Sequence, residues 1–110
     1  MDDDPAVRRL VVRGLRGDGH RVVSASSVAE AQARLGVESF DVVLCDQVLH
    51  DGSGTEVLAG LARLASTPDG VLVTGYEAPD PCAWSVLPKP FGVRELRRLV
   101  AETVAARTSG

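Results

Sequence analysis

FDVVLCDQVLHDGSG, residues 40–54, carries the clearest fold signal in the chain. Its first half is an almost continuous apolar run that ends on Asp46. Such a run is typical of a parallel strand that helices cover on both faces. Its second half contains a glycine-rich turn that leads into GTEVLAGLARLA, where apolar residues recur at helical spacing. A strand, a turn and a helix therefore follow one another here.

The same alternation continues on both sides of this stretch. Apolar periodicity predicts helices near residues 5–16, 27–35, 54–65 and 91–106, and short apolar runs predict strands near residues 20–26, 40–46, 70–75 and 84–90. This pattern favours an α/β fold with a doubly wound parallel sheet. The stretch between Thr74 and Lys89 is too short for a loop, a full helix and another strand. A complete alternation would place a helix there, the fourth of five, and we expect this fourth helix to be short or missing.

Length and composition are those of one ordinary globular domain. The chain has 110 residues, 45% of them hydrophobic and 25% charged, and we expect one domain over residues 1–110. It has no apolar run long enough to cross a bilayer and no secretory signal, which predicts a cytoplasmic protein with no membrane partner. A net charge of −3 argues against direct nucleic-acid binding. Cys45 and Cys82 do not form a disulfide framework in such a chain, so we expect two unpaired thiols.

Polar residues follow three of the predicted strands. Asp46, Thr74 and Lys89 each come at the end of a separate apolar run, and Lys89 is the single lysine in a chain that otherwise uses arginine. Ligands bind at the carboxyl ends of the strands in open parallel sheets, where these side chains and the acidic cluster at residues 2–4 should converge. Clustered carboxylates call for a hard cation such as Mg²⁺. An ammonium and a hydroxyl beside that ion make a phosphoryl site, in which a carboxylate can become an aspartyl phosphate.

Four motifs in this order carry a family resemblance: DDDP, FDVVLCDQVLHDGSG, VLVTG and LPKPF. Together they resemble the receiver domain of bacterial two-component response regulators, over nearly the whole chain from residue 2. The resemblance implies a flavodoxin-like fold, with Asp46 as phosphoacceptor, Thr74 as switching hydroxyl and Lys89 as the ammonium that pairs with the phosphate. It also implies a cis peptide bond between Lys89 and Pro90.

The resemblance further implies a magnesium site and two tuning positions. Asp2 and Asp3 resemble the acidic pair that binds Mg²⁺, with Asp46 and the backbone carbonyl of Val48 completing the protein's ligands. Val48 and Tyr76 flank the site and are expected to tune the access of water to the phosphoryl group. Simpler explanations stay open: residues 2–4 can be a solvated acidic terminus that complements the dipole of the first helix, and Thr74 can serve only the local backbone. His50 is expected to be a turn residue and Trp84 a core or edge anchor.

The resemblance breaks at two places. The family has a hydrophobic strand directly before the acidic pair, between the second and third strands of the sheet order 2-1-3-4-5, and here only Met1 stands there. We therefore expect the first strand to be absent from this chain and the domain to be truncated at its N-terminus, with the true start lying upstream. The aromatic residue of the usual switch is replaced by Val86, which puts output by that switch in doubt.

The leading functional hypothesis is a phosphoacceptor module. A sensor histidine kinase or phosphotransfer protein would donate a phosphoryl group to Asp46 with Mg²⁺, and the domain would then change its affinity for an output partner or for a second copy of itself. It would assist its own phosphorylation, and slow dephosphorylation, without being a metabolic enzyme. The alternative is a degenerate receiver that acts as a phosphorylation-independent interaction module. A small phosphatase is a third hypothesis, disfavoured because Val48 stands where such enzymes carry a second aspartate.

Overall fold

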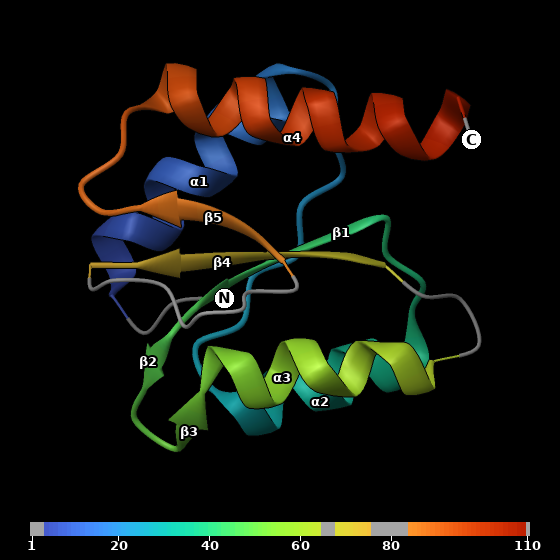
Figure 1. The fold of residues 1–110 in the computed structure, drawn as a ribbon. Helices are drawn as coiled ribbons and strands as arrows, with labels where there is room; N and C mark the ends of the chain where they lie inside the picture. The colour runs from blue at the N-terminus through green and yellow to red at the C-terminus, as the bar shows by residue number, and fades with distance from the viewer. Residues whose placement is uncertain (1–3, 65–67, 76–83, 110) are drawn as a thin grey trace.

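The computed structural model describes residues 4–64, 68–75 and 84–109 (Figure 1). Along the chain the elements are α1 (Pro5–Gly17), α2 (Val28–Val37), β1 (Val42–Asp46), β2 (Val48–Leu49), β3 (Gly52–Ser53), α3 (Gly54–Gly60), a 3₁₀ turn (Leu61–Arg63), β4 (Asp69–Thr74), β5 (Ser85–Pro88) and α4 (Val93–Ser109). None of the helices described is long and apolar enough to span a bilayer.

Short polar side chains begin the first three helices. The Asp4 carboxylate accepts a hydrogen bond from the Ala6 N–H at 2.9 Å, and Pro5 occupies the first helical position, where its missing N–H leaves no partner unsatisfied. Ser27 caps α2 and Ser53 caps α3 in the same manner, each accepting from the N–H of a glutamate three residues later. These caps explain why the helices begin where their apolar repeats do.

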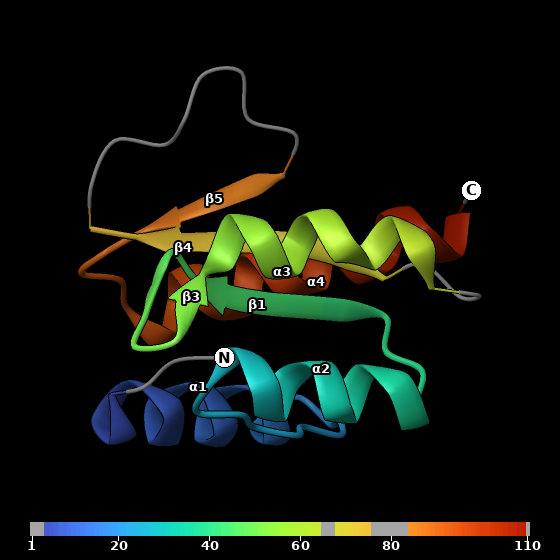
Figure 2. The ribbon, with the colours of Figure 1, turned by 90° about the horizontal axis from the view of Figure 1, so that it is seen from below.

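The main sheet has three parallel strands in the order β1-β4-β5. Helices α1 and α4 lie on one side of this sheet, and α3 and α2 lie on the other (Figure 1). Seen from below, α3 lies across β1 and β4, whereas α2 lies to one side, beyond β1 (Figure 2). The expected α/β fold with a parallel sheet is confirmed.

Each face of the sheet packs against its own helices. Val71 and Val73 of β4 join a cluster with Leu96 and Val100 of α4, while Leu72 points to the opposite face and joins a cluster with Leu58 of α3. Alternate residues of a strand point to opposite faces, so a strand with helices on both sides must be apolar at every position. This is why β4 is a continuous hydrophobic run.

Trp84 is partly buried and packs against the hydrophobic cluster on the α3 side, in agreement with its prediction as a core or edge anchor. A Cβ atom at Gly70 would lie 2.8 Å from the Trp84 ring and 2.9 Å from a Leu58 methyl group. Any larger residue at position 70 would displace one of the two side chains.

Two sequence-based expectations about this region were wrong. Residues 20–26 form no strand, and the helix predicted to reach residue 65 ends as α-helix at Gly60 and continues only as a 3₁₀ turn. A strand requires a hydrogen-bonded neighbour. Within the described chain, β1 is the edge strand of the sheet, and no strand lies between it and residues 21–25. The apolar alternation of residues 20–26 identified an inward-facing segment but could not supply its partner. The helix expected to be short or missing between Thr74 and Lys89, which is not α4, would fall on residues 76–83, and these lie outside the described residues.

An apolar cleft lies between α1, the segment that follows it and β1. Its volume is about 360 Å³, and its lining includes Val11, Leu15, Val22, Ala25, Val42 and Leu44. Interiors of folded domains normally leave few voids larger than a water molecule. The cleft lies beside β1, between that strand and residues 21–25, which is the position that the sheet order 2-1-3-4-5 gives to the first strand of the resembled family.

The loop that follows β1 is tied to α2 by Asp51. This carboxylate accepts hydrogen bonds from the N–H groups of Val28, at 2.9 Å, and Ala29, at 3.2 Å, at the start of α2. The Val28 hydrogen bond is the main reason why the pKa of Asp51 lies below its ordinary value of 3.8. Gly52 permits the approach, because a Cβ atom there would lie 2.9 Å from a Val28 methyl group. A carboxylate far from α2 in the sequence thus caps that helix.

We expect that joining a five-residue alternating apolar segment directly before residue 1 will stabilise the domain. Each Val or Leu side chain buried in the cleft should contribute roughly 1.5–3 kcal/mol, and 1 kcal/mol raises the unfolding midpoint of a domain this size by about 4–8 °C. Thermal unfolding measures the change. A matched extension of Ser and Asp is the control, and an equal midpoint for both extensions would contradict the assignment of the cleft to a strand.

The Asp51 cap makes a pH-dependent contribution to stability. Because the folded pKa lies below the unfolded one, the contribution is complete above about pH 5 and is lost as the pH falls through the folded pKa. The stability difference between wild type and Asp51→Asn should therefore shrink as the pH falls below about 5, as measured by urea unfolding. Ser27→Ala removes a cap of the same helix that does not titrate, and its stability loss should change less over that range. An Asp51→Asn difference that stays constant with pH would contradict this assignment.

Candidate functional site

Asp46 and Lys89 form an ion pair at the carboxyl end of the sheet. Asp46 is the last residue of β1, and Lys89 follows β5, two strands away in the sheet. The Lys89 Nζ donates to Asp46 Oδ2 at 2.8 Å, and the aspartate side chain is only 10% exposed. A carboxylate that is nearly buried needs such a partner, because burial of an unpaired charge is costly.

Thr74 lies between these two groups in the sheet order. It is the last residue of β4, it is 2% exposed, and its carbonyl accepts a hydrogen bond from the Lys89 N–H at 2.8 Å. The register pairs Asp46 with Val73 and Thr74 with Pro88, so all three strands end at nearly the same level. The structure thus brings Asp46, Thr74 and Lys89 to one edge.

The loop after Asp46 is held by backbone contacts on both sides. The Gln47 N–H donates to the Val73 carbonyl at 2.8 Å, and the Gln47 carbonyl accepts from the Gly54 N–H at 2.9 Å. The Gln47 side-chain oxygen accepts from the Thr55 N–H at 3.1 Å, which caps the first turn of α3. Gln47 therefore joins the end of β1 to β4 and to α3.

Gly54 allows α3 to begin directly behind Asp46. A Cβ atom at this position would lie 2.4 Å from the Asp46 carbonyl oxygen, closer than any side chain can approach. The turn carried by β2 and β3 therefore returns the chain tightly against the phosphoacceptor candidate, and it places the exposed Val48 beside the site.

The two carboxylate oxygens of Asp46 have different surroundings. Oδ2 accepts the strong hydrogen bond from Lys89, whereas Oδ1 accepts from the Val48 N–H at 3.4 Å, near the long limit of hydrogen bonding. Oδ1 is thus the less engaged oxygen. Such an arrangement can orient a carboxylate as a nucleophile or as a cation ligand.

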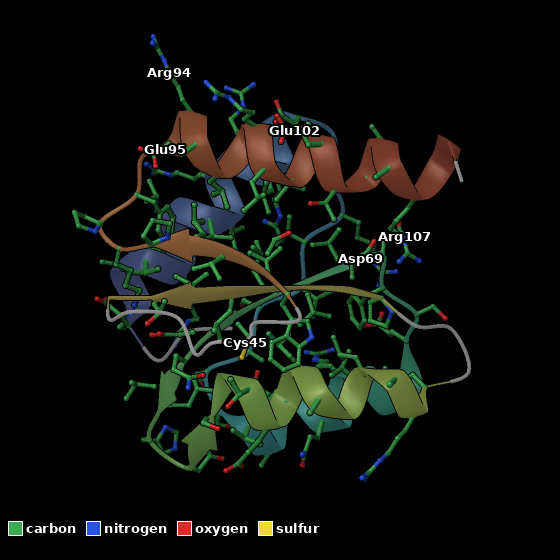
Figure 3. All side chains as sticks on the ribbon, viewed as in Figure 1. Cys45, Asp69, Arg94, Glu95, Glu102 and Arg107 are labelled. Atoms are coloured by element: carbon green, nitrogen blue, oxygen red, sulfur yellow. The ribbon has the colours of Figure 1, made fainter. Side chains whose placement is uncertain are left out.

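The predicted site residues divide between those that the structure describes and those that it does not. Asp46, Thr74, Lys89 and Val48 lie together, and the Lys89–Pro90 peptide bond is cis. Asp2, Asp3 and Tyr76 lie outside the described residues. Within the described part of the chain, no group of three or more His, Cys, Asp and Glu side chains could hold a metal ion. Cys45 is buried between the sheet and α3 and forms no disulfide bond with a described residue (Figure 3), whereas Cys82 lies outside the described residues.

Sequence reasoning missed three residues that support this site. Gln47, Asp51 and Gly54 act through backbone contacts, and their roles depend on elements that are distant in the sequence. The one available signal was the Asp-Gly-Ser-Gly turn between a buried strand and a helix, which favours tight turns and helix caps but does not say which helix is capped. His50 lies in this turn, as expected.

Comparisons with known proteins agree with this geometry. The family model described as "Response regulator receiver domain" matches residues 1–101. The KDP operon transcriptional regulatory protein KdpE of Escherichia coli is 31% identical over 103 residues, which cover 88% of this chain and 46% of KdpE. The chain thus spans about half the length of that relative.

Two solved structures show the same fold. A CheY-like response regulator receiver domain protein from Methanospirillum hungatei has a TM-score of 0.89 at 27% identity, covering 99% of this chain and 94% of its own. The response regulator TrrA from Thermotoga maritima, solved in complex with Mg²⁺-BeF, has a TM-score of 0.82 at 25% identity, covering 93% of this chain and 93% of its own.

 

Each of these two structural matches covers at least 93% of both chains. The match of the family model to most of the chain, together with these structural likenesses, establishes the family: this chain belongs to the response regulator receiver domains of two-component systems.

Proposed function

We propose that this receiver domain is a phosphoacceptor module that takes a phosphoryl group onto Asp46. The observation that supports this best is the 2.8 Å contact between the Asp46 carboxylate and the Lys89 ammonium. Thr74 ends β4, which lies between β1, the strand of Asp46, and β5, the strand before Lys89. These are a nucleophile, a cation and a hydroxyl at one edge of a parallel sheet, where ligands of such folds bind. The family match favours phosphorylation over the alternative of a phosphorylation-independent interaction module.

The phosphoryl donor would be the phosphohistidine of a sensor histidine kinase or a phosphotransfer protein. An oxygen of Asp46 attacks phosphorus, the new O–P bond forms as the P–N bond of the donor breaks, and the imidazole leaves with the electron pair. Oδ1 is the better placed oxygen, because Oδ2 is the acceptor for Lys89. The domain would thus assist its own phosphorylation, and slow dephosphorylation, by positioning and charge.

Lys89 and Thr74 would stabilise the transferred group. The Lys89 ammonium can neutralise a phosphoryl oxygen while staying close to Asp46, and the Thr74 hydroxyl can donate a hydrogen bond to another. Thr74 would then act as the switching hydroxyl. Val48 and Tyr76 would tune the access of water to the phosphoryl group, and a changed surface would alter binding to an output partner or to a second copy of the domain.

A Mg²⁺ ion fits the chemistry of the donor set. Asp46 supplies a carboxylate and the exposed loop residue Val48 a backbone carbonyl, both of them the oxygen ligands that Mg²⁺ prefers. Asp2 and Asp3 would complete the protein's ligands. When bound, the ion would neutralise charge on the phosphoryl oxygens. The Mg²⁺-BeF complex of TrrA supports this assignment.

The wider setting of the domain is part of the same proposal. We place it in the cytoplasm, where histidine kinases present their phosphohistidine, with no membrane or direct nucleic-acid partner for this domain. The relative KdpE is a transcriptional regulator about twice as long as the matched region, so an output partner or domain is expected.

Incubation with acetyl phosphate and Mg²⁺ should add one phosphoryl group to the wild-type chain and none to Asp46→Asn, as measured by intact mass. Asp41→Asn, which changes an exposed carboxylate at the opposite end of β1, is the matched control and should be modified like wild type. Removal of Mg²⁺ with a chelator should abolish the modification. Phosphorylation of Asp46→Asn at the wild-type level would overturn the proposal.

A further inference from the structure

The charges of this protein are segregated between its layers. Helices α1 and α4 together hold eight arginines and two glutamates, whereas the whole chain has 12 Lys and Arg against 15 Asp and Glu. The two helices pack side by side on one side of the sheet (Figure 1). An acidic protein thus presents one basic layer.

Five of these arginines form two outward stripes, which we call the arginine face: Arg9, Arg13 and Arg16 on α1, and Arg94 and Arg98 on α4. Their spacing of three and four residues puts each stripe on one side of its helix, opposite the buried Leu15 and Leu96. All five are exposed, and Arg94 points away from the body of the molecule (Figure 3). None of the five has an ion-pair partner among the described residues.

The other arginines of this layer have structural partners. Arg97 forms a bidentate pair with Asp18, which follows α1, and this pair joins the two helices. Arg107 donates to Asp69 of β4 at 3.2 Å, at the far end of α4 (Figure 3). The arginine face is therefore distinct from the residues that hold the layer together.

Arg9, Arg13 and Arg94 of the arginine face do not serve the stability of their helices. Arg9 and Arg13, and likewise Arg94 and Arg98, are like charges four residues apart, a spacing that destabilises a helix. Arg94 also lies in the first turn of α4, where the helix dipole disfavours a cation. Helix α1 has no acidic residue to offset its four arginines. Arg16, in the last turn of α1, and Arg98, between Glu95 and Glu102 on α4, do favour their helices, but folding alone gives no reason for the other three arginines.

We propose that the arginine face is a docking surface for an acidic polypeptide segment of a partner protein. Carboxylates at helical or extended spacing can pair with the guanidinium groups along each stripe. Glu95 and Glu102 are the acidic groups on α4 that flank these arginines, and they would disfavour partners that lack a matching pattern.

The shape and charge of the layer favour a polypeptide over nucleic acid. Both helices pack against the sheet and against each other, so neither projects far enough to enter a groove of duplex DNA. The strongly acidic remainder of the chain would repel a long polyanion. Both helices begin at the carboxyl end of the sheet, so a partner seated on the arginine face would lie beside the Asp46 site (Figure 1).

Binding of a fluorescent 15-residue peptide of Glu and Ala, measured by anisotropy at low and high salt, tests the proposal. The probe should bind wild type in a salt-dependent way, and the double variants Arg9→Gln/Arg13→Gln and Arg94→Gln/Arg98→Gln should each weaken binding roughly two- to thirtyfold. The double variant Arg34→Gln/Arg63→Gln makes the same charge change at exposed positions outside the layer and should bind like wild type. The Arg9→Gln/Arg13→Gln variant should not lower the unfolding midpoint.

Three results would overturn the proposal. Equal weakening by the control would show that only net charge matters. Tighter binding of a single-stranded DNA of similar charge, or of phosphatidylserine vesicles, would assign the face to a different class of partner. A lower unfolding midpoint for both arginine-face variants would assign their arginines to the fold. None of these readouts uses phosphorylation, so the outcome is separate from that of the proposed function.

Discussion

Parallel pairing of β1, β4 and β5 is the constraint on which the rest of this structure depends. Because the three strands run in one direction, their carboxyl ends meet at one edge, and Asp46, Thr74 and Lys89 meet there too. The same pairing leaves two faces that must both be buried, which explains the helices on each side and the apolar character of β4. The parallel pairing of the strands therefore determines both the position of the site and the apolar composition of the core.

The ion pair between Asp46 and Lys89 stabilises the carboxylate and still leaves one of its oxygens less engaged. A nearly buried carboxylate is costly without a counter-charge, and Lys89 supplies that charge to one oxygen while leaving the other less engaged. Around this pair, Gln47 and Gly54 draw the loop tightly against the end of β1, and Asp51 ties the same loop to α2. The loop beside the site is therefore braced by two helices.

The two sides of the sheet differ in what their helices contact. The side covered by α2 and α3 braces the loop beside Asp46, whereas α1 and α4 present arginines to the solvent. The apolar cleft lies between α1 and β1, and residues of α1, β1 and the intervening segment all line it. Occupation of the cleft would join α1 more firmly to the sheet, and so would connect the arginine face to the strand that carries Asp46.

The sequence by itself determined the alternation of strands and helices, the parallel sheet and the residues at the strand ends, because apolar periodicity and strand-end polarity are local properties of the chain. It did not determine that residues 20–26 form no strand, since strand formation depends on a neighbour. Nor did it show that Asp51 caps α2 or that Arg97 pairs with Asp18 while Arg94 has no partner in the described chain. Those contacts join elements far apart in the sequence, and only the packing of the helices on the sheet brings them within hydrogen-bonding distance.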